Sequence, residues 1–127
     1  MRQTFQKKER LCSRKKIGTI FVSGTSMVNF PLRLIWIEQQ PEEQTQITFS
    51  IPKKLFKRAV DRNLLKRRLR ECYRKQKHQL YDGLKAAGKS YAMVWVYTSR
   101  EILAYNVLEK ATNSSIQRLL NGAKSIV

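Results

Sequence analysis

Residues 51–81 constrain the fold most strongly, because this stretch combines a dense run of positive charge with a helical apolar repeat. Between Lys53 and Lys77 there are twelve lysines and arginines but two acids. At about 100° per residue, one stripe of a helix would collect side chains suited to a core. These are Leu65, Leu69, Cys72, Tyr73, Gln76 and Leu80. The pattern predicts a packed amphipathic helix over residues 59–80.

A second face of this helix is predicted to be strongly basic. It collects Asn63, Lys66, Arg67, Arg70, Arg74 and Lys77, while Arg68 and Lys75 fall on the far flank. A charge run on a helix is often an ordinary solvated face, balanced by acids one turn away. Acids are scarce here, so repulsion between like charges would destabilise the helix in the absence of an anionic partner. We therefore expect this face to bind a polyanion.

The composition favours one nucleic-acid-binding domain over residues 1–127. A chain of 127 residues is long enough for a single core, and its net charge of +17 favours nucleic acid over an anionic membrane surface. Residues 1–10 are polar and basic, and we expect them to form a mobile arm. The chain shows neither a membrane-spanning apolar run nor a signal-peptide core, so we expect no membrane partner and a cytoplasmic location.

The first half of the chain predicts a short helix followed by strands. Ser13 is a suitable N-cap for a helix that ends at Ser23 and Gly24. Residues 28–38 and 47–51 alternate as β-strands, and the polar turn at 39–46 would join them as a hairpin. The stretch around Phe21 and Val22 is a further candidate for strand pairing.

The second half predicts a buried strand between two helices. Residues 82–88 are expected to form a loop, and the continuous apolar run at 91–98 suits a central strand that is buried on both faces. A final helix is predicted over residues 105–120, ended by Gly122 and with Val107 among its inward side chains. The order is helix, two or three strands, basic helix, strand, helix. The predicted fold class is therefore α+β, a two-layer sandwich of helices against a small sheet.

No set of residues predicts catalysis or metal binding by the protein alone. His78 is the only histidine, and we expect it at the surface. Cys12 and Cys72 lack neighbours at metal-ligand spacing, and Cys72 lies on the apolar stripe as a small buried residue. If the chain assists a reaction, a partner must supply the reacting groups.

Aromatic side chains leave two interpretations open. Phe21, Trp36 and Phe49 are either core residues or a platform on which unpaired bases stack. Aromatic residues in strands belong to the core more often than to such platforms, and the residues by themselves do not separate the two cases.

The motifs Lys53-Lys54 and Arg62-Asn63-Leu64-Leu65-Lys66-Arg67 resemble the protein subunit of bacterial ribonuclease P. That family carries Lys-Lys at the end of a strand and, further on, an Arg-Asn-Arg segment that opens a helix. The order of the other elements agrees along nearly the whole chain. Leu64 stands at the third motif position, where the family has Arg, and Ile17 stands where an aromatic residue is frequent.

The resemblance implies a protein that assists a catalytic RNA in removing the 5′ leader of precursor tRNA. The RNA would hydrolyse the phosphodiester with Mg²⁺ that it mainly binds itself, and no obligate protein partner is expected. RNA-binding residues would be Lys53, Lys54, Arg58, Arg62, Asn63, Lys66, Arg67, Arg70 and Arg74. The leader would lie in a cleft between the first helix and the sheet, against Ile17, Phe21, Trp36 and Phe49. A left-handed βαβ crossover is also implied by the resemblance.

Two alternatives have distinguishable requirements. A ribosomal or other structural RNA-binding protein would share the size and charge but would need no groove for a single strand. A protein-only nuclease would need clustered acids to hold metal ions. The acids of this chain are scattered in sequence.

Overall fold

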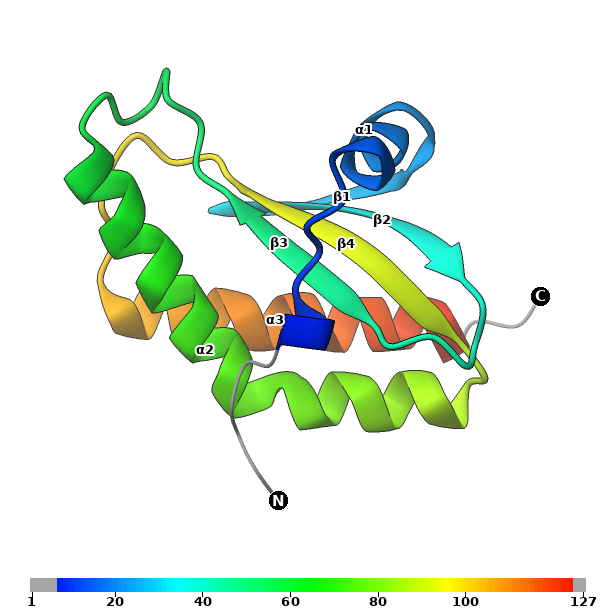
Figure 1. Ribbon diagram of the computed structural model, residues 1–127. Coiled ribbons are helices and arrows are strands. Elements are labelled where there is room, and N and C mark those ends of the chain that lie inside the picture. Colours follow the sequence, from blue (N-terminus) through cyan, green and yellow to red (C-terminus); the bar gives the residue numbers. More distant parts are fainter. Residues whose placement is uncertain (1–6, 125–127) are drawn as a thin grey trace.

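A four-stranded sheet separates the helices into two groups in the computed structural model, which describes residues 7–124 (Figure 1). The long helices α2 (Ala59–Ala86) and α3 (Tyr105–Lys124) cover one face of the sheet, and α1 (Arg14–Ser23) lies on the other. A short 3-10 helix, η1 (Lys7–Glu9), precedes α1. The predicted α+β sandwich is confirmed, with α1 added on its open side.

The strand order of the sheet is β1-β2-β4-β3. The strands are β1 (Thr25–Asn29), β2 (Leu32–Gln39), β3 (Gln46–Ser50) and β4 (Ser90–Tyr97). Strands β1, β2 and β4 pair antiparallel, whereas β3 pairs with β4 in parallel. Helix α2 therefore forms the crossover between two parallel neighbours.

Three predictions about the strands are wrong. The hairpin between the second and third strands does not form, because β4 lies between β2 and β3. Residues 28–38 are not one strand, since a turn at Phe30 and Pro31 separates β1 from β2. Phe21 and Val22 belong to α1 and pair with no strand.

The expected central strand is confirmed in β4, which is buried on both faces. Met93 and Trp95 face the α2/α3 layer, and Ala92 and Val94 face α1. The second set packs with Ile20 of α1 in a smaller cluster. The continuous apolar sequence of this strand thus follows from helices on both sides of the sheet.

The helices agree with prediction in their packing faces and differ in length. All six residues of the predicted stripe of α2 are buried, and the side chain of Ser13 caps α1 by accepting a hydrogen bond from the Lys16 amide at 3.2 Å. The prediction of a loop over residues 82–88 is wrong for residues 82–86, because α2 continues to Ala86. Within this part of the helix, Gly83 packs against Leu120 of α3. Gly122 does not end α3, and Val107 is 41% exposed.

Part of the expected mobile arm is packed. Residues 1–6 lie outside the described residues, but Glu9 is buried and its carboxylate binds the Lys77 ammonium at 2.8 Å. Arg10 forms a parallel bridge with Ile47 beside β3. Lys77 consequently does not belong to the exposed basic face on which its helical position placed it. Among residues 7–124, every helix is too short or too polar to cross a bilayer.

Candidate nucleic-acid interface

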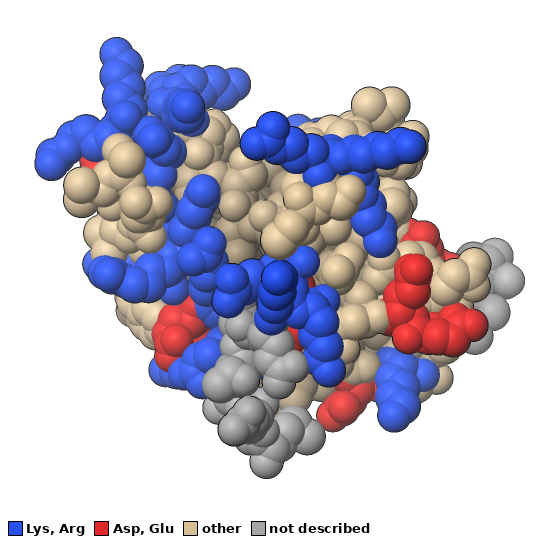
Figure 2. All heavy atoms as spheres, viewed as in Figure 1, with Lys and Arg blue, Asp and Glu red and all other residues tan. Residues whose placement is uncertain are grey.

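The loop at residues 51–58 and the adjoining face of α2 form a continuous basic surface (Figure 2). Most of the predicted RNA-binding side chains are exposed there, namely Lys53, Lys54, Arg58, Asn63, Arg67 and Arg70, and Lys66 is half-buried. The apolar stripe holds α2 against the sheet and so fixes the direction of this face. The positive charges are carried on a rigid element, which reduces the entropy lost when a ligand binds.

Arg62 is bound to the protein itself. Its guanidinium donates hydrogen bonds to the backbone carbonyls of Phe56 at 2.7 Å and Lys57 at 2.9 Å. These bonds fasten the basic loop to the first turn of α2. Arg62 thus positions the loop that carries Lys53, Lys54 and Arg58, whatever further contact its other N–H groups make.

Two other arginines of α2 are also engaged. Arg74 donates from Nε to Glu71 at 3.0 Å, and this hydrogen bond holds the pKa of the Glu71 carboxyl below its ordinary value. Arg68 donates to the Leu103 carbonyl at 3.1 Å and so ties α2 to the loop before α3. Arg74 therefore presents a partly neutralised charge, and the charge on the exposed face comes mainly from Lys66, Arg67 and Arg70.

A row of side chains crosses the α1-facing side of the sheet without being covered by α1. The strand registers align Ser50 of β3 with Val96 of β4, Val96 with Arg33 of β2, and Arg33 with Val28 of β1. Ser50 and Val96 are half-buried, and Arg33 and Val28 are exposed. The next row, which includes Val94 and Ile35, is buried beneath α1. The open row is thus the floor of a groove along one side of α1.

Basic side chains lie on both sides of this groove. Figure 2 shows a hollow between the lysines and arginines of the loop before α2 and those over α1. Arg14 and Lys15 of α1 are exposed, as are Lys53 and Lys54 across the groove. Phe21 on α1 is 50% exposed, and Ile17 is half-buried against the smaller cluster. The groove combines apolar and cationic surface, the combination that suits unpaired nucleotides.

Two of the four predicted leader-binding residues lie on the wrong face of the sheet. Phe49 is 7% exposed and packs edge-on against Trp95 and Tyr73, with ring centroids 5.9 Å away from each. Trp36 packs against the same core and lies 6.0 Å from the Tyr91 ring. Both side chains point toward α2 and α3. The prediction that they line a cleft beside α1 is wrong.

Arg33 is a groove residue that the sequence predictions omitted. It alternates with Leu32 and Leu34, both of which are completely buried on the α2/α3 side. A charged residue between two buried leucines must face the other side of the sheet. That period-two signal was present in the sequence, but it did not show that the other side forms an open groove.

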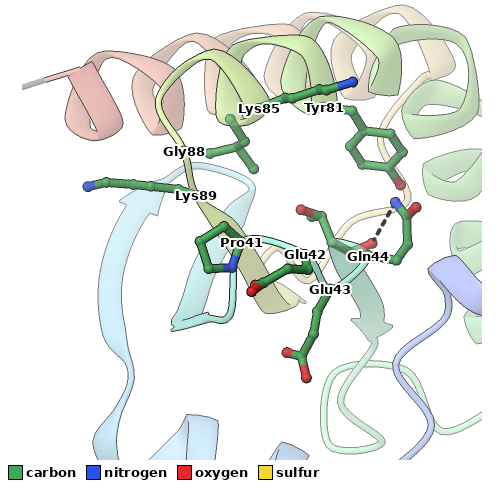
Figure 3. A pocket seen from close by; sticks show the side chains of 10 residues that line it. Pro41, Glu42, Glu43, Gln44, Tyr81, Lys85, Gly88 and Lys89 are labelled. Carbon is green, nitrogen blue, oxygen red and sulfur yellow. Dashed lines mark hydrogen bonds between the residues drawn. The ribbon is translucent and has the colours of Figure 1, made fainter.

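A cavity of about 540 Å³ lies at the far end of α2, against the β2–β3 loop (Figure 3). Its lining includes Glu42, Glu43, Tyr81, Lys85 and Lys89. Figure 3 shows the ammonium ends of Lys85 and Lys89 directed away from the two carboxylates. The lining carries two carboxylates and two ammonium groups, so this end attracts RNA less than the basic surface of α2 does.

The part of the chain that the structure describes gathers no candidate metal-binding cluster, since no three of its His, Cys, Asp or Glu side chains lie together in a way that could hold a metal ion. His78 is half-buried, so its expected surface position is only partly correct. Cys72 is buried as predicted, and burial raises the pKa of its thiol.

Comparison with known proteins identifies the family. The family model described as Ribonuclease P matches residues 5–121. The ribonuclease P protein component of Porphyromonas gingivalis is 33% identical over 121 residues, which is 94% of this chain and 88% of the relative. The chain belongs to the ribonuclease P protein family.

A further relative and two solved structures agree with this assignment. The ribonuclease P protein component of Chlorobium phaeobacteroides is 35% identical over 83 residues, 61% of this chain and 57% of that protein. The ribonuclease P protein of Thermotoga maritima has the same fold, with a TM-score of 0.71 at 20% identity over 87% of this chain and 96% of that one. The ribonuclease P protein of Staphylococcus aureus also has this fold, with a TM-score of 0.70 at 18% identity over 93% of this chain and 97% of that one.

Family membership settles the general role of the chain. It is the protein component of an endoribonuclease complex in which RNA carries the catalysis, and RNA binding and tRNA processing follow from the family. Among residues 7–124, the basic surface and the groove are the candidate contacts for RNA.

Proposed function

We propose that the chain binds the catalytic RNA of ribonuclease P through the basic face of α2 and binds the 5′ leader of precursor tRNA in the groove beside α1. The observation that carries the proposal is the separation of two surfaces. The first is a helix face rich in lysine and arginine, which suits the phosphates of a folded RNA. The second is a groove lined by both apolar and cationic side chains, which suits a single strand.

The protein would contribute binding energy and leave the chemistry to the RNA. We propose that Mg²⁺ is held mainly by the RNA partner, where it would activate the attacking water and stabilise the leaving oxygen. Lys53 and Lys54 lie where the basic loop meets the groove, so they would neutralise phosphates close to the junction of the two RNAs. A cytoplasmic location remains a prediction.

The division into two surfaces can be tested with substitutions on each. Arg67 and Arg70 are exposed and lie outside the buried stripe, so replacing both with alanine should leave the fold intact. Each lost charged hydrogen bond should weaken binding to catalytic RNA by about 1.5–3 kcal/mol. Phe21→Ala should spare this affinity and reduce the preference of the holoenzyme for precursor tRNA over mature tRNA.

Lys110→Ala is a suitable control, because Lys110 is an exposed cation on α3 that belongs to neither of the two proposed surfaces. Arg68 does not serve as a control, since its side chain is tied to Leu103. The measurements are the affinity of each protein for catalytic RNA and of each holoenzyme for the two tRNA forms. Equal losses in both affinities from every variant would refute the division.

A structural RNA-binding protein without a processing role is the competing hypothesis. It predicts RNA binding that depends on α2 but no preference for precursor over mature tRNA. The wild-type holoenzyme at low Mg²⁺ therefore separates the two, because a groove that holds the leader must make precursor the better ligand.

A further inference from the structure

The groove floor continues to the β1 edge of the sheet, beyond the residues assigned to the leader so far. From Ser50 to Val28 the row crosses all four strands, about 14 Å at the usual spacing of strands in a sheet. The basic loop and α2 lie at its β3 end. The β1 end is therefore the part of the groove farthest from the surface proposed for catalytic RNA.

Arg33 places a positive charge on the floor near this distal end. Its side chain is exposed, and its Nε donates to the Ser26 hydroxyl at 3.2 Å. Ser26 lies on the same face of β1 as Val28 and is in register with Ile35, so this bond holds the guanidinium on the groove side of the sheet and directs it toward α1. Among the described residues, Arg33 has no carboxylate partner. Its charge is available to a phosphate.

An exposed aromatic residue follows at the turn between β1 and β2. Phe30 is 67% exposed and Val28 is 65% exposed. Residues 17–32 contain no charged side chain, although 28% of the chain is charged. The exposed Val28 and Phe30 side chains of this uncharged segment lie at the β1 end of the groove floor and are candidates for contact with a ligand.

The turn that carries Phe30 is fixed by bonds to two neighbouring elements. The amide and hydroxyl of Thr98, just after β4, donate to the Pro31 carbonyl at 2.8 and 3.0 Å. Asn29 donates to the Ala111 carbonyl of α3 at 3.2 Å, and Arg118 of α3 donates to the Val28 carbonyl at 2.7 Å. The exposure of Phe30 is thus built into an anchored turn, and such preorganisation favours binding.

We propose that Arg33 and Phe30 form a distal nucleotide subsite of the leader groove. Arg33 would bind a phosphate and Phe30 would contact an unpaired base, the pairing of cation and aromatic ring by which proteins hold single strands. The proposal rests on the proposed function and extends it. RNA is favoured over a second protein copy because two chains of net charge +17 repel each other.

The subsite has a consequence for substrate length. A short leader occupies only the end of the groove near the basic loop, whereas a leader that crosses the sheet also reaches Arg33 and Phe30. The affinity of wild-type holoenzyme for precursor tRNA should therefore rise as the leader lengthens, and it should stop rising once the leader is long enough to reach the β1 edge. Arg33→Ala and Phe30→Ala should each weaken binding of the holoenzyme to precursor tRNA with a long leader about tenfold. Neither should change the affinity for precursor tRNA with a short leader.

The two residues can be separated by salt and by conservative replacement. Arg33→Ala should reduce the slope of log affinity against log salt by about 0.7 for long leaders, and Arg33→Lys should restore it. Phe30→Ala should leave the slope unchanged, and Phe30→Tyr should restore affinity. Lys110→Ala serves as the control at every leader length.

Unchanged affinity for short leaders shows that a variant is folded and assembled. If wild-type holoenzyme prefers precursor over mature tRNA but neither variant alters the gain with leader length, the distal subsite is refuted and the proposed function stands. If the wild type shows no preference for precursor at all, the proposed function itself fails. Losses that are equal for short and long leaders would also overturn the subsite.

Discussion

Lys77 lies in the most basic stretch of the chain, but its ammonium group is buried against the Glu9 carboxylate. The hydroxyl of Tyr81 donates to the same carboxylate at 2.8 Å, and Tyr73 donates to Tyr81 at 3.2 Å. This network joins the segment before α1 to the middle of α2. It therefore links the element that forms one wall of the groove to the helix that carries the basic face.

Removing one partner of the buried pair should destabilise the fold. Lys77→Met would leave the Glu9 carboxylate buried without its main countercharge, which costs about 3–5 kcal/mol. Urea unfolding followed by circular dichroism measures the loss. The double variant Glu9→Gln with Lys77→Met should recover part of it, because neither residue then carries a charge. A double variant as unstable as the sum of the two single variants would contradict this explanation.

The two cysteines should differ in reactivity. Cys12 is exposed, whereas Cys72 lies on the buried stripe of α2, where burial raises the pKa of its thiol. The thiolate is the reactive form, so both access and ionisation protect Cys72. A thiol reagent such as dithionitrobenzoate at neutral pH should modify Cys12 quickly and Cys72 only as the protein unfolds. Cys12→Ser should abolish the fast phase, and rapid loss of both thiols in the native protein would disprove the prediction.

At the scale of elements, the junction between α1 and β1 depends on close backbone packing. Gly24 has an ordinary φ of −72°, so left-handed geometry is not its reason. A Cβ there would lie 2.4 Å from the Ile20 carbonyl oxygen and 3.0 Å from that of Trp36. These backbone atoms cannot rotate away. The glycine allows α1 to turn directly into the edge strand and thereby sets the position of the groove wall.

Two glycine substitutions test this packing with opposite expected signs. Gly24→Ala should lower the free energy of unfolding by about 1–3 kcal/mol, because it forces backbone shifts in a packed junction. Gly18 lies inside α1, and no described residue beyond the adjoining helix backbone comes within 4 Å of the place that a Cβ would take. Gly18→Ala should therefore raise stability by about 0.5–1 kcal/mol through helix propensity. Thermal unfolding of both variants provides the measurement, and a stabilised Gly24→Ala protein would show that the junction can relax.

Local periodicity explains which elements could be predicted. The stripe of α2 follows from a helical repeat within its own sequence, and the buried strand β4 follows from a continuous apolar run. Both predictions are confirmed. The placement of β4 between β2 and β3 depends on contacts between distant residues, which no local repeat records. The true end of α2 was missed for a similar reason, since Gly83 is held in the helix by packing near Leu120.

The same limit applies to the candidate site. Alternation separates the two faces of a strand but does not say which face a helix will cover. The residues alone leave Phe49 and Trp36 open between core and groove, and only the family resemblance places them in the groove, although both contact the α2/α3 core. Arg62 was predicted as an RNA ligand from its motif, and its bonds to the Phe56 and Lys57 carbonyls form only when the loop folds back on the helix.

At the scale of the whole molecule, charge is divided between its two ends. The basic loop and the first half of α2 lie at one end of the sheet, and the β2–β3 loop with Glu42 and Glu43 lies at the other (Figure 2). Glu38 near that loop pairs with Lys89 at 3.6 Å. The resulting field orients an approaching polyanion toward the α2 end, so electrostatics would set the direction of docking as well as its strength.

Binding to catalytic RNA should therefore weaken steeply with salt. Each phosphate neutralised by a lysine or arginine releases bound counterions, so log affinity should fall with log salt by about 0.7–0.9 per contact between roughly 50 and 200 mM. The paired substitution of Arg67 and Arg70 with alanine should reduce this slope by about 1.4–1.8, because two contacts are removed from the exposed face. Lys85→Ala should change it little, because Lys85 lies at the acidic end beside the β2–β3 loop. If Lys85→Ala lowered the slope as much per residue as the paired variant, RNA would contact both ends of the molecule and the orienting field would have no role in docking.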